Sequence, residues 1–141
     1  MKEGSWKEHL WRRLNEPQPL TLDQIAERHA CEELGAVVPN DGSKSNRKGF
    51  DVMLGDQRVE VKSKKDALRR VGSRYVGVTE SKRHSDRFWV YLFGETAAEL
   101  DVWEIATEAV FANLDARKGT AIKVATVQKK GRRIWSASAA G

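Results

Sequence analysis

Several features that narrow the function of a small protein are scarce or missing in this sequence. Cys31 is the only cysteine, which excludes an intrachain disulfide and a cysteine-based zinc site. The three histidines, His9, His29 and His84, are scattered without the spacing of metal ligands. No apolar run reaches the roughly 18 residues of a membrane-spanning helix, and no signal-peptide pattern opens the chain. We therefore expect a soluble, cytoplasmic protein without a membrane partner.

Length and charge predict one domain that binds a polyanion. The chain has 141 residues, and we expect a single domain over 1–141, with an N-terminal helix and linker over 1–20 and a basic tail over 128–141. Its 25 lysines and arginines outnumber its 20 acids and give a formal charge of +5. Such an excess favours a nucleic-acid partner. So short a chain also favours a homodimer or a larger complex.

A hairpin is the most informative feature of the sequence. Alternating apolar and polar residues over 50–54 and 57–62 flank Gly55-Asp56, a pair typical of a two-residue turn. Because such a turn fixes the register, it pairs Asp51 with Glu60 across the two strands. The period of two then sorts the side chains. One face carries Phe50, Val52, Leu54, Val59 and Val61, and the other carries Asp51, Met53, Arg58, Glu60 and Lys62.

The predicted pairing places two carboxylates side by side, with the Cβ atoms of Asp51 and Glu60 about 4.5 to 5.5 Å apart. Adjacent carboxylates repel, so the pair either shares a proton or binds a cation. Oxygen ligands without cysteine or histidine favour Mg²⁺, with Mn²⁺ as a substitute. The alternative is a solvated hairpin face without function, which like-charge repulsion makes unfavourable.

This pattern resembles the PD-(D/E)xK nuclease superfamily, whose core hairpin carries an Asp on one strand and Glu-x-Lys on the next. Asp51, Glu60 and Lys62 match that motif, and Phe50 stands where the family often has Pro. The resemblance implies that Asp51, Glu60 and the main-chain carbonyl of Val61 bind the metal, and that Lys62 positions or activates the attacking water. A second Glu-x-Lys, at 80–82, has no Asp in a matching partner position. Register therefore carries the argument more than the tripeptide does.

A helix before the hairpin adds a further candidate ligand. Thr21 and Gln24 form a capping-box pattern, and the predicted helix ends at Gly35. The order of helix and hairpin resembles the start of archaeal-type Holliday-junction resolvases and restriction-endonuclease-like relatives, in which a helix Glu can complete the metal site. The resemblance implies this role for Glu27, and an exposed helix residue is the alternative.

Basic and hydroxylic residues before and after the hairpin are the candidate DNA contacts. They are Ser43, Lys44, Arg47, Lys48, Lys64, Lys65, Arg69, Arg70, Lys82 and Arg83. A positive field around the acids would hold phosphates against the metal. Solvated charge runs are the plain alternative. The tail also carries Lys129, Lys130, Arg132 and Arg133 around Gly131, and the sequence leaves open whether it is a DNA-contact arm or only a soluble terminus.

The rest of the chain predicts an α/β or α+β domain with a restriction-endonuclease-like mixed sheet of about five strands flanked by helices. Strands are expected at 36–38, 74–79, 88–93, 100–105 and 121–127, the third of these buried on both faces. Helices are expected over 5–14, where apolar spacing places Trp6 in the core, and around Thr107 to Leu114. Residues 64–71 are read as a short helix or irregular turn with a positive face.

We therefore expect a Mg²⁺-dependent endonuclease that hydrolyses DNA. The alternatives are a non-catalytic DNA-binding module and an accessory subunit of a DNA-processing assembly with the same fold. The sequence does not separate DNA from RNA, and it leaves restriction, recombination and repair open.

Overall fold

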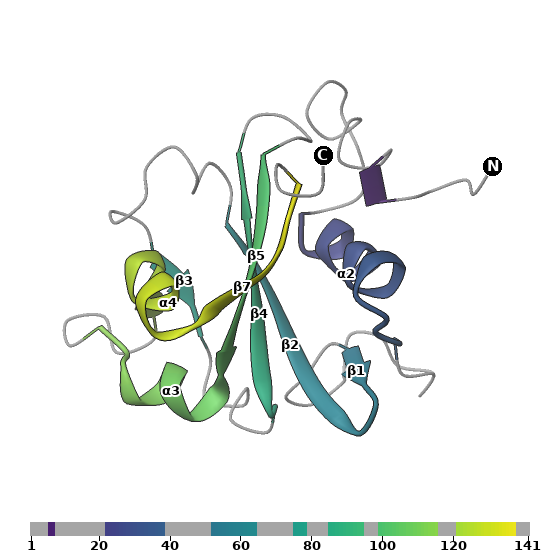
Figure 1. Cartoon of the computed structure of the whole chain (residues 1–141). Coiled ribbons are helices and arrows are strands. Elements are labelled where there is room, and N and C mark those ends of the chain that lie inside the picture. Colours follow the sequence, from purple (N-terminus) through teal and green to yellow (C-terminus); the bar gives the residue numbers. More distant parts are fainter. Residues whose placement is uncertain are drawn as a thin grey trace.

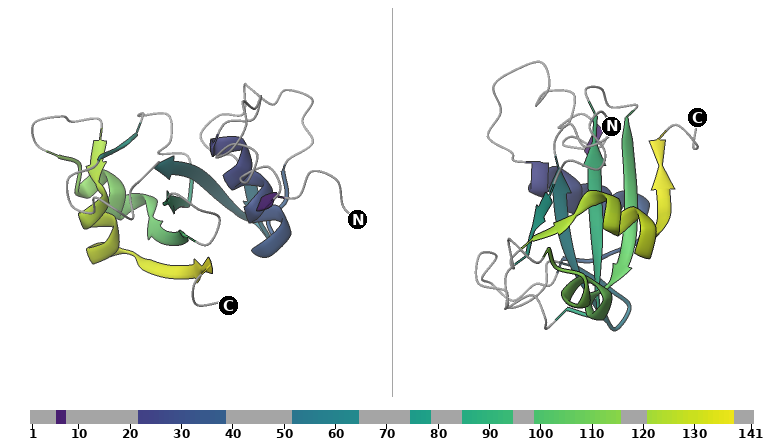
Figure 2. Two further views of the ribbon diagram at one scale, coloured as in Figure 1. Left: turned by 90° about the horizontal axis from the view of Figure 1, so that it is seen from above. Right: turned by 90° about the vertical axis from the view of Figure 1, so that its left-hand side faces the viewer.

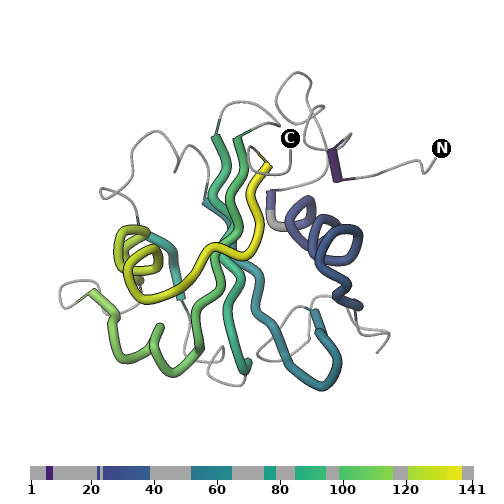
Figure 3. Tube along the Cα trace, viewed as in Figure 1, coloured from purple at the N-terminus to yellow at the C-terminus, as the bar shows by residue number. Residues whose placement is uncertain are grey.

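A computed structural model describes residues 6–7, 22–38, 52–64, 75–78, 85–94, 99–115 and 121–137, coloured in Figure 3. In chain order the elements are α2 (Leu22–Glu33), β1 (Val52–Leu54), β2 (Gln57–Lys64), β3 (Tyr75–Gly77), β4 (Arg87–Phe93), β5 (Leu100–Ala106), α3 (Thr107–Ala112), β6 (Ala121–Lys123), α4 (Val124–Lys130) and β7 (Arg132–Ser136). No helix in these ranges is long and apolar enough to cross a membrane.

A five-stranded mixed sheet in the order β1-β2-β4-β5-β7 organises the molecule. β2 and β4 run parallel, and the other neighbouring strands are antiparallel. β4 lies in the middle of the sheet, and every residue from Phe88 to Phe93 is buried. Its continuous apolar run thus forms the central strand, as the sequence predicts, because layers cover both faces of the sheet.

The two faces of the sheet carry separate cores. α2 covers one face, where Val59, Val61 and Trp89 pack with the helix residue Ile25. α3, α4 and a small sheet of β3 and β6 lie on the other face, over Phe88 and Val90. Figures 1 and 2 show α2 on one side of the sheet, and β3, α3 and α4 on the opposite side. The protein is thus a mixed α/β fold of three layers.

Most of the predicted elements are confirmed. α2 ends just before Gly35, which has a φ of 77° that favours glycine. Residues 36–38 form an edge through an antiparallel bridge between Val37 and Met53. Trp6 is 1 % exposed, and residues 6–7 are helical. The other residues of the helix expected over 5–14, and residues 65–71, lie outside the described ranges.

One expectation for the C-terminal part is wrong. The strand predicted over 121–127 ends at Lys123, and α4 begins at Val124. Val124 and Val127 are both fully buried, because their spacing of three residues places them on one side of a helix. The predicted basic tail begins inside α4 and continues as β7 in the central sheet. Partial burial of Ile134 and Trp135 against the core anchors this strand.

Candidate functional site

The hairpin that carries the predicted site has the predicted register. Val52 pairs with Val59, and Leu54 with Gln57, around the turn at Gly55 and Asp56. Gly55 has a φ of 62°, which an L side chain rarely adopts and which a primed turn requires. The Asp51–Glu60 pair would be the next in this register, but Asp51 lies outside the described residues, so that pairing stays a prediction.

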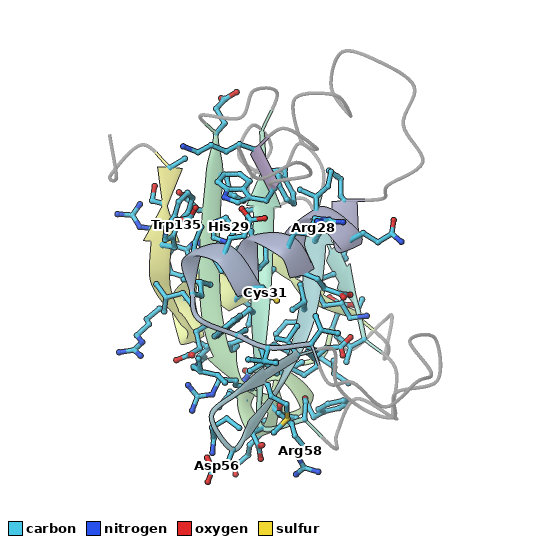
Figure 4. All side chains as sticks on the ribbon, turned by 90° about the vertical axis from the view of Figure 1, so that its right-hand side faces the viewer. Arg28, His29, Cys31, Asp56, Arg58 and Trp135 are labelled. Carbon is cyan, nitrogen blue, oxygen red and sulfur yellow. The ribbon has the colours of Figure 1, made fainter. Side chains whose placement is uncertain are left out.

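Two hydrogen bonds between Arg58 and Asp86, one to a carboxylate and one to a carbonyl oxygen, tie the hairpin to the start of β4. The Arg58 N–H donates to a carboxylate oxygen of Asp86 at 2.7 Å, and the Asp86 N–H donates to the carbonyl oxygen of Arg58 at 2.7 Å. The hydrogen bond from the Arg58 main chain lowers the pKa of Asp86. Figure 4 shows Arg58 and Asp56 at the end of the hairpin. The position of β2 beside the central strand is therefore fixed at this end.

Glu60 lies on the face of β2 opposite α2. Its neighbours Val59 and Val61 pack in the core beneath the helix, so alternation directs Glu60 to the other face. Glu60 pairs across the parallel ladder with Phe88, and Lys62 with Val90. Both partners belong to the core beneath α3 and α4. The two motif side chains therefore share the face that the C-terminal layer covers.

Glu60 is buried, which the sequence did not predict. Its side chain is 2 % exposed, and one carboxylate oxygen lies 3.4 Å from the Nζ of Lys62, which is 23 % exposed. The alternative of a solvated hairpin face therefore does not describe Glu60. A buried carboxylate beside a lysine is a costly arrangement, since apolar residues of similar volume are often as stable or more stable. Buried ionisable side chains with a specific charge partner cluster at functional sites.

The structure describes the two other predicted metal ligands, Val61 and Glu27, but does not test their roles. Val61 lies between Glu60 and Lys62 in β2 and is 3 % exposed; a metal-binding role of its carbonyl stays a prediction. Glu27 belongs to α2, whose residues Ile25 and Ala26 pack on the face opposite Glu60. The structure thus does not place Glu27 on the same face as the motif, and its role in a metal site also stays a prediction.

Of the predicted DNA contacts, the structure describes Lys64 alone. It is the last residue of β2, is half-buried, and alternation places it on the same face as Glu60 and Lys62. The other nine fall outside the described ranges. They are Ser43, Lys44, Arg47, Lys48, Lys65, Arg69, Arg70, Lys82 and Arg83. One face of β2 therefore presents Glu60, Lys62 and Lys64 in a row.

The donor chemistry fits a hard cation. Among the described residues no three histidine, cysteine or acidic side chains gather closely enough to hold a metal, and Asp51, the predicted partner of Glu60, lies outside these residues. Carboxylate and carbonyl oxygens from Asp51, Glu60 and Val61 are ligands that Mg²⁺ and Mn²⁺ accept.

A buried polar cluster that sequence reasoning missed lies beneath α2, on the other face of the sheet. The His29 ring nitrogen Nδ1 is 2.9 Å from the hydroxyl of Tyr91, and the rings of Trp6 and Trp135 lie edge-on to the imidazole. Burial lowers the pKa of His29 to about 3. Figure 4 shows His29 beside Trp135. His29 shares the buried side of α2 with Ile25 and Ala26, but nothing local in the sequence identifies Tyr91 as its partner.

The carboxylate of Glu104 gathers donors on the same face as α2. It accepts from the guanidinium of Arg87 at 2.8 Å and from the indole of Trp89 at 3.0 Å. Arg132 of β7 adds a third contact at 3.2 Å. Partial burial raises the pKa of Glu104, but the hydrogen bonds from Trp89 and Arg87 outweigh it and the pKa is lowered overall. This cluster joins three neighbouring strands.

In comparisons with known proteins, no family model matches the chain and no curated protein is detectably similar to it.

Proposed function

We propose that the protein is a metal-dependent nuclease whose active site is the β1–β2 hairpin. The observation that carries the proposal is the buried carboxylate of Glu60, 3.4 Å from the ammonium group of Lys62. Both stand on one face of a strand whose hairpin has the predicted register. That register supports the pairing of Asp51 with Glu60, although Asp51 itself lies outside the described residues.

In this proposal the hairpin residues divide the work. Asp51, Glu60 and the carbonyl of Val61 hold Mg²⁺, which when bound polarises a phosphoryl oxygen and lowers the pKa of water. Lys62 orients the attacking water or offsets the negative charge that develops on the phosphate. Its ammonium group lies beside Glu60, so it is already held in place by the carboxylate. Charge stabilisation requires no loss of its proton.

The burial of Glu60 also supports the proposed metal site. Charges act over a longer range where water is excluded, so a carboxylate in the protein interior attracts a cation more strongly than one in solvent. The excess of lysine and arginine over acids favours a polyanionic substrate. DNA is the substrate we propose, cut at its phosphodiester bonds.

A cleavage assay tests the proposal. The protein is incubated with plasmid, linear duplex, single strand, four-way junction and RNA, each with Mg²⁺, with Mn²⁺ and with EDTA. We expect cleavage of DNA in the two metal arms and none in EDTA. Binding without cleavage in every arm would instead identify a DNA-binding module, and absence of both would identify an accessory subunit. Cleavage that persists in EDTA would exclude the metal site.

A further inference from the structure

The last two described segments have complementary charges. Residues 99–115 contain five acids and no lysine or arginine, whereas residues 121–137 contain five lysines and arginines and no acid. Three contacts join them: Arg132 with Glu104 at 3.2 Å, Arg133 with Asp101 at 4.0 Å, and Lys123 with Asp115 at 4.0 Å. Three of the five cations thus have an acid nearby.

Lys129 and Lys130 differ from these three. Both are exposed at the end of α4, and within the described ranges neither is in an ion pair. With Arg132 and Arg133, which are 76 % and 50 % exposed, they surround Gly131. We name these four residues the basic turn. Within the described ranges no other stretch of five residues contains four cations.

Gly131 holds the basic turn rigidly against the sheet. A Cβ atom at this position would lie 2.5 Å from the carbonyl oxygen of Glu104 and 2.8 Å from that of Val127. Both are main-chain atoms, so any side chain would push α4 away from β5. The Gly131 N–H also donates to the Val127 carbonyl at 2.7 Å. Lys129 and Lys130 therefore stand at a fixed junction between a helix and a strand. Arg133 lies on the same face of the sheet as α4, whereas Arg132 contacts Glu104 on the face of α2.

The basic turn lies level with Glu60. On the face that α4 covers, Glu60 pairs with Phe88, and Phe88 with Ile105. This row ends at Gly131, whose added Cβ would meet the Cβ of Ile105 at 3.2 Å. Three strand spacings, about 14 Å, separate Glu60 on β2 from Gly131 at the start of β7, because β4 and β5 lie between them. This separation is comparable to the major groove of B-DNA, which is about 12 Å wide, so one duplex can offer phosphates to both places.

From this placement we infer that the basic turn binds the phosphate backbone of the duplex whose scissile phosphate lies at Glu60. The inference rests on the proposed function for its substrate. Lys129 and Lys130 are the main contacts, because Arg132 and Arg133 already have acids nearby. A membrane surface fits less well, since the apolar residues of α4, Val124 and Val127, are fully buried and nothing apolar is left to insert.

The test compares two double variants that each remove two positive charges. Lys129→Ala/Lys130→Ala removes the cations without an acid partner. The control, Lys7→Ala/Lys123→Ala, removes two other exposed cations, of which Lys7 lies over the Trp6 ring and Lys123 lies near Asp115. Binding to a duplex is measured from about 50 to 200 mM salt, with EDTA and with Ca²⁺ in place of Mg²⁺. Two lost phosphate contacts should lower affinity about tenfold at the low-salt end and reduce the salt slope by about 2.

The control variant should keep most of the affinity, and thermal melts should show both variants folded. Equal slopes for the two variants and the unchanged protein overturn the inference, while Mg²⁺-dependent cleavage by the unchanged protein would leave the proposed function standing. Conversely, if Lys129→Ala/Lys130→Ala reduces the salt slope but the unchanged protein does not cleave DNA, the basic turn is a DNA-binding surface and the proposed nuclease activity is wrong. No duplex binding in either buffer overturns both. The inference is also overturned if Lys129→Ala/Lys130→Ala alone loses binding to phosphatidylserine vesicles while its DNA binding stays intact.

Discussion

Glu60 and Lys62 stand two residues apart on one face of β2, with a carboxylate oxygen and the ammonium nitrogen 3.4 Å from each other. The pair is asymmetric. Glu60 is almost fully buried, whereas the lysine retains 23 % of its exposure and its long stem can carry the charge to water. Removal of one partner should therefore have unequal consequences for the two residues.

Glu60→Gln should abolish metal-dependent cleavage with a stability equal to or higher than that of the unchanged protein. The substitution removes a buried charge and, in the predicted register, half of a repulsive acid pair, while Lys62 can turn to solvent. Asp51→Asn should behave in the same way. Calorimetric titration with Mn²⁺, run beside thermal melts, measures both properties. Intact metal binding and cleavage in both variants would place the site elsewhere.

Lys62→Ala should also lose cleavage but should retain metal binding. It leaves the Glu60 carboxylate buried without its lysine, so unfolding free energy should fall by about 1 to 3 kcal/mol in the absence of metal. Added Mn²⁺ should restore part of this loss, because a ligand that binds the folded state stabilises it. A variant as stable as the unchanged protein would contradict this reading of the pair.

Val59→Asp tests which side chains of β2 face the core beneath α2. Val59 is fully buried beneath α2, and an unpaired charge there should cost about 4 kcal/mol or more of stability. Val37→Asp makes the same chemical change on a side chain that is 63 % exposed, so it should alter stability by about 0.5 kcal/mol or less. Denaturant unfolding measures the difference. Similar midpoints for the two variants would show that the assigned faces are wrong.

Local signals were sufficient for much of the fold. Gly55-Asp56 fixed the hairpin register because a two-residue turn leaves one pairing, and the run from Phe88 to Phe93 predicted a strand buried on both faces. Gly35 marked the end of α2 through its positive φ. Each of these inferences needed only neighbouring residues.

The burial of Glu60 could not be predicted in this way, because the elements on its face of the sheet, which are α3, α4 and the small sheet of β3 and β6, all come later in the chain. The apolar residues Val124 and Val127 fit a strand or a helix over so short a segment, and contacts with Ile105 and Val110 decided for the helix. The contact of His29 with Tyr91 likewise joins residues far apart in the sequence. Tertiary packing settled what periodicity left ambiguous.

The buried His29 predicts a pH dependence of stability that is separate from catalysis. Its pKa falls from 6.5 to about 3 on folding, because burial disfavours the charged imidazole. Between these values the unfolded chain binds a proton that the folded protein does not, so stability should rise with pH across this window. The slope from this group should approach about 1.4 kcal/mol per pH unit between about pH 4 and pH 5.5 and should vanish above about pH 7 and below the folded pKa of about 3.

His29→Gln removes the titrating group and keeps a side chain that can hydrogen-bond to the Tyr91 hydroxyl, so it separates titration from packing. This variant should be less stable at pH 7, because the edge-on contacts with Trp6 and Trp135 are lost. Its stability should nonetheless fall less steeply than that of the unchanged protein between pH 6 and pH 4. Urea unfolding at a series of pH values gives both slopes.

Because acidic groups such as Glu104, whose pKa is lowered, also lose stabilisation as pH falls, the difference between the two slopes is the quantity that isolates His29. Parallel curves would mean that the imidazole carries its proton in the folded protein as it does in the unfolded chain.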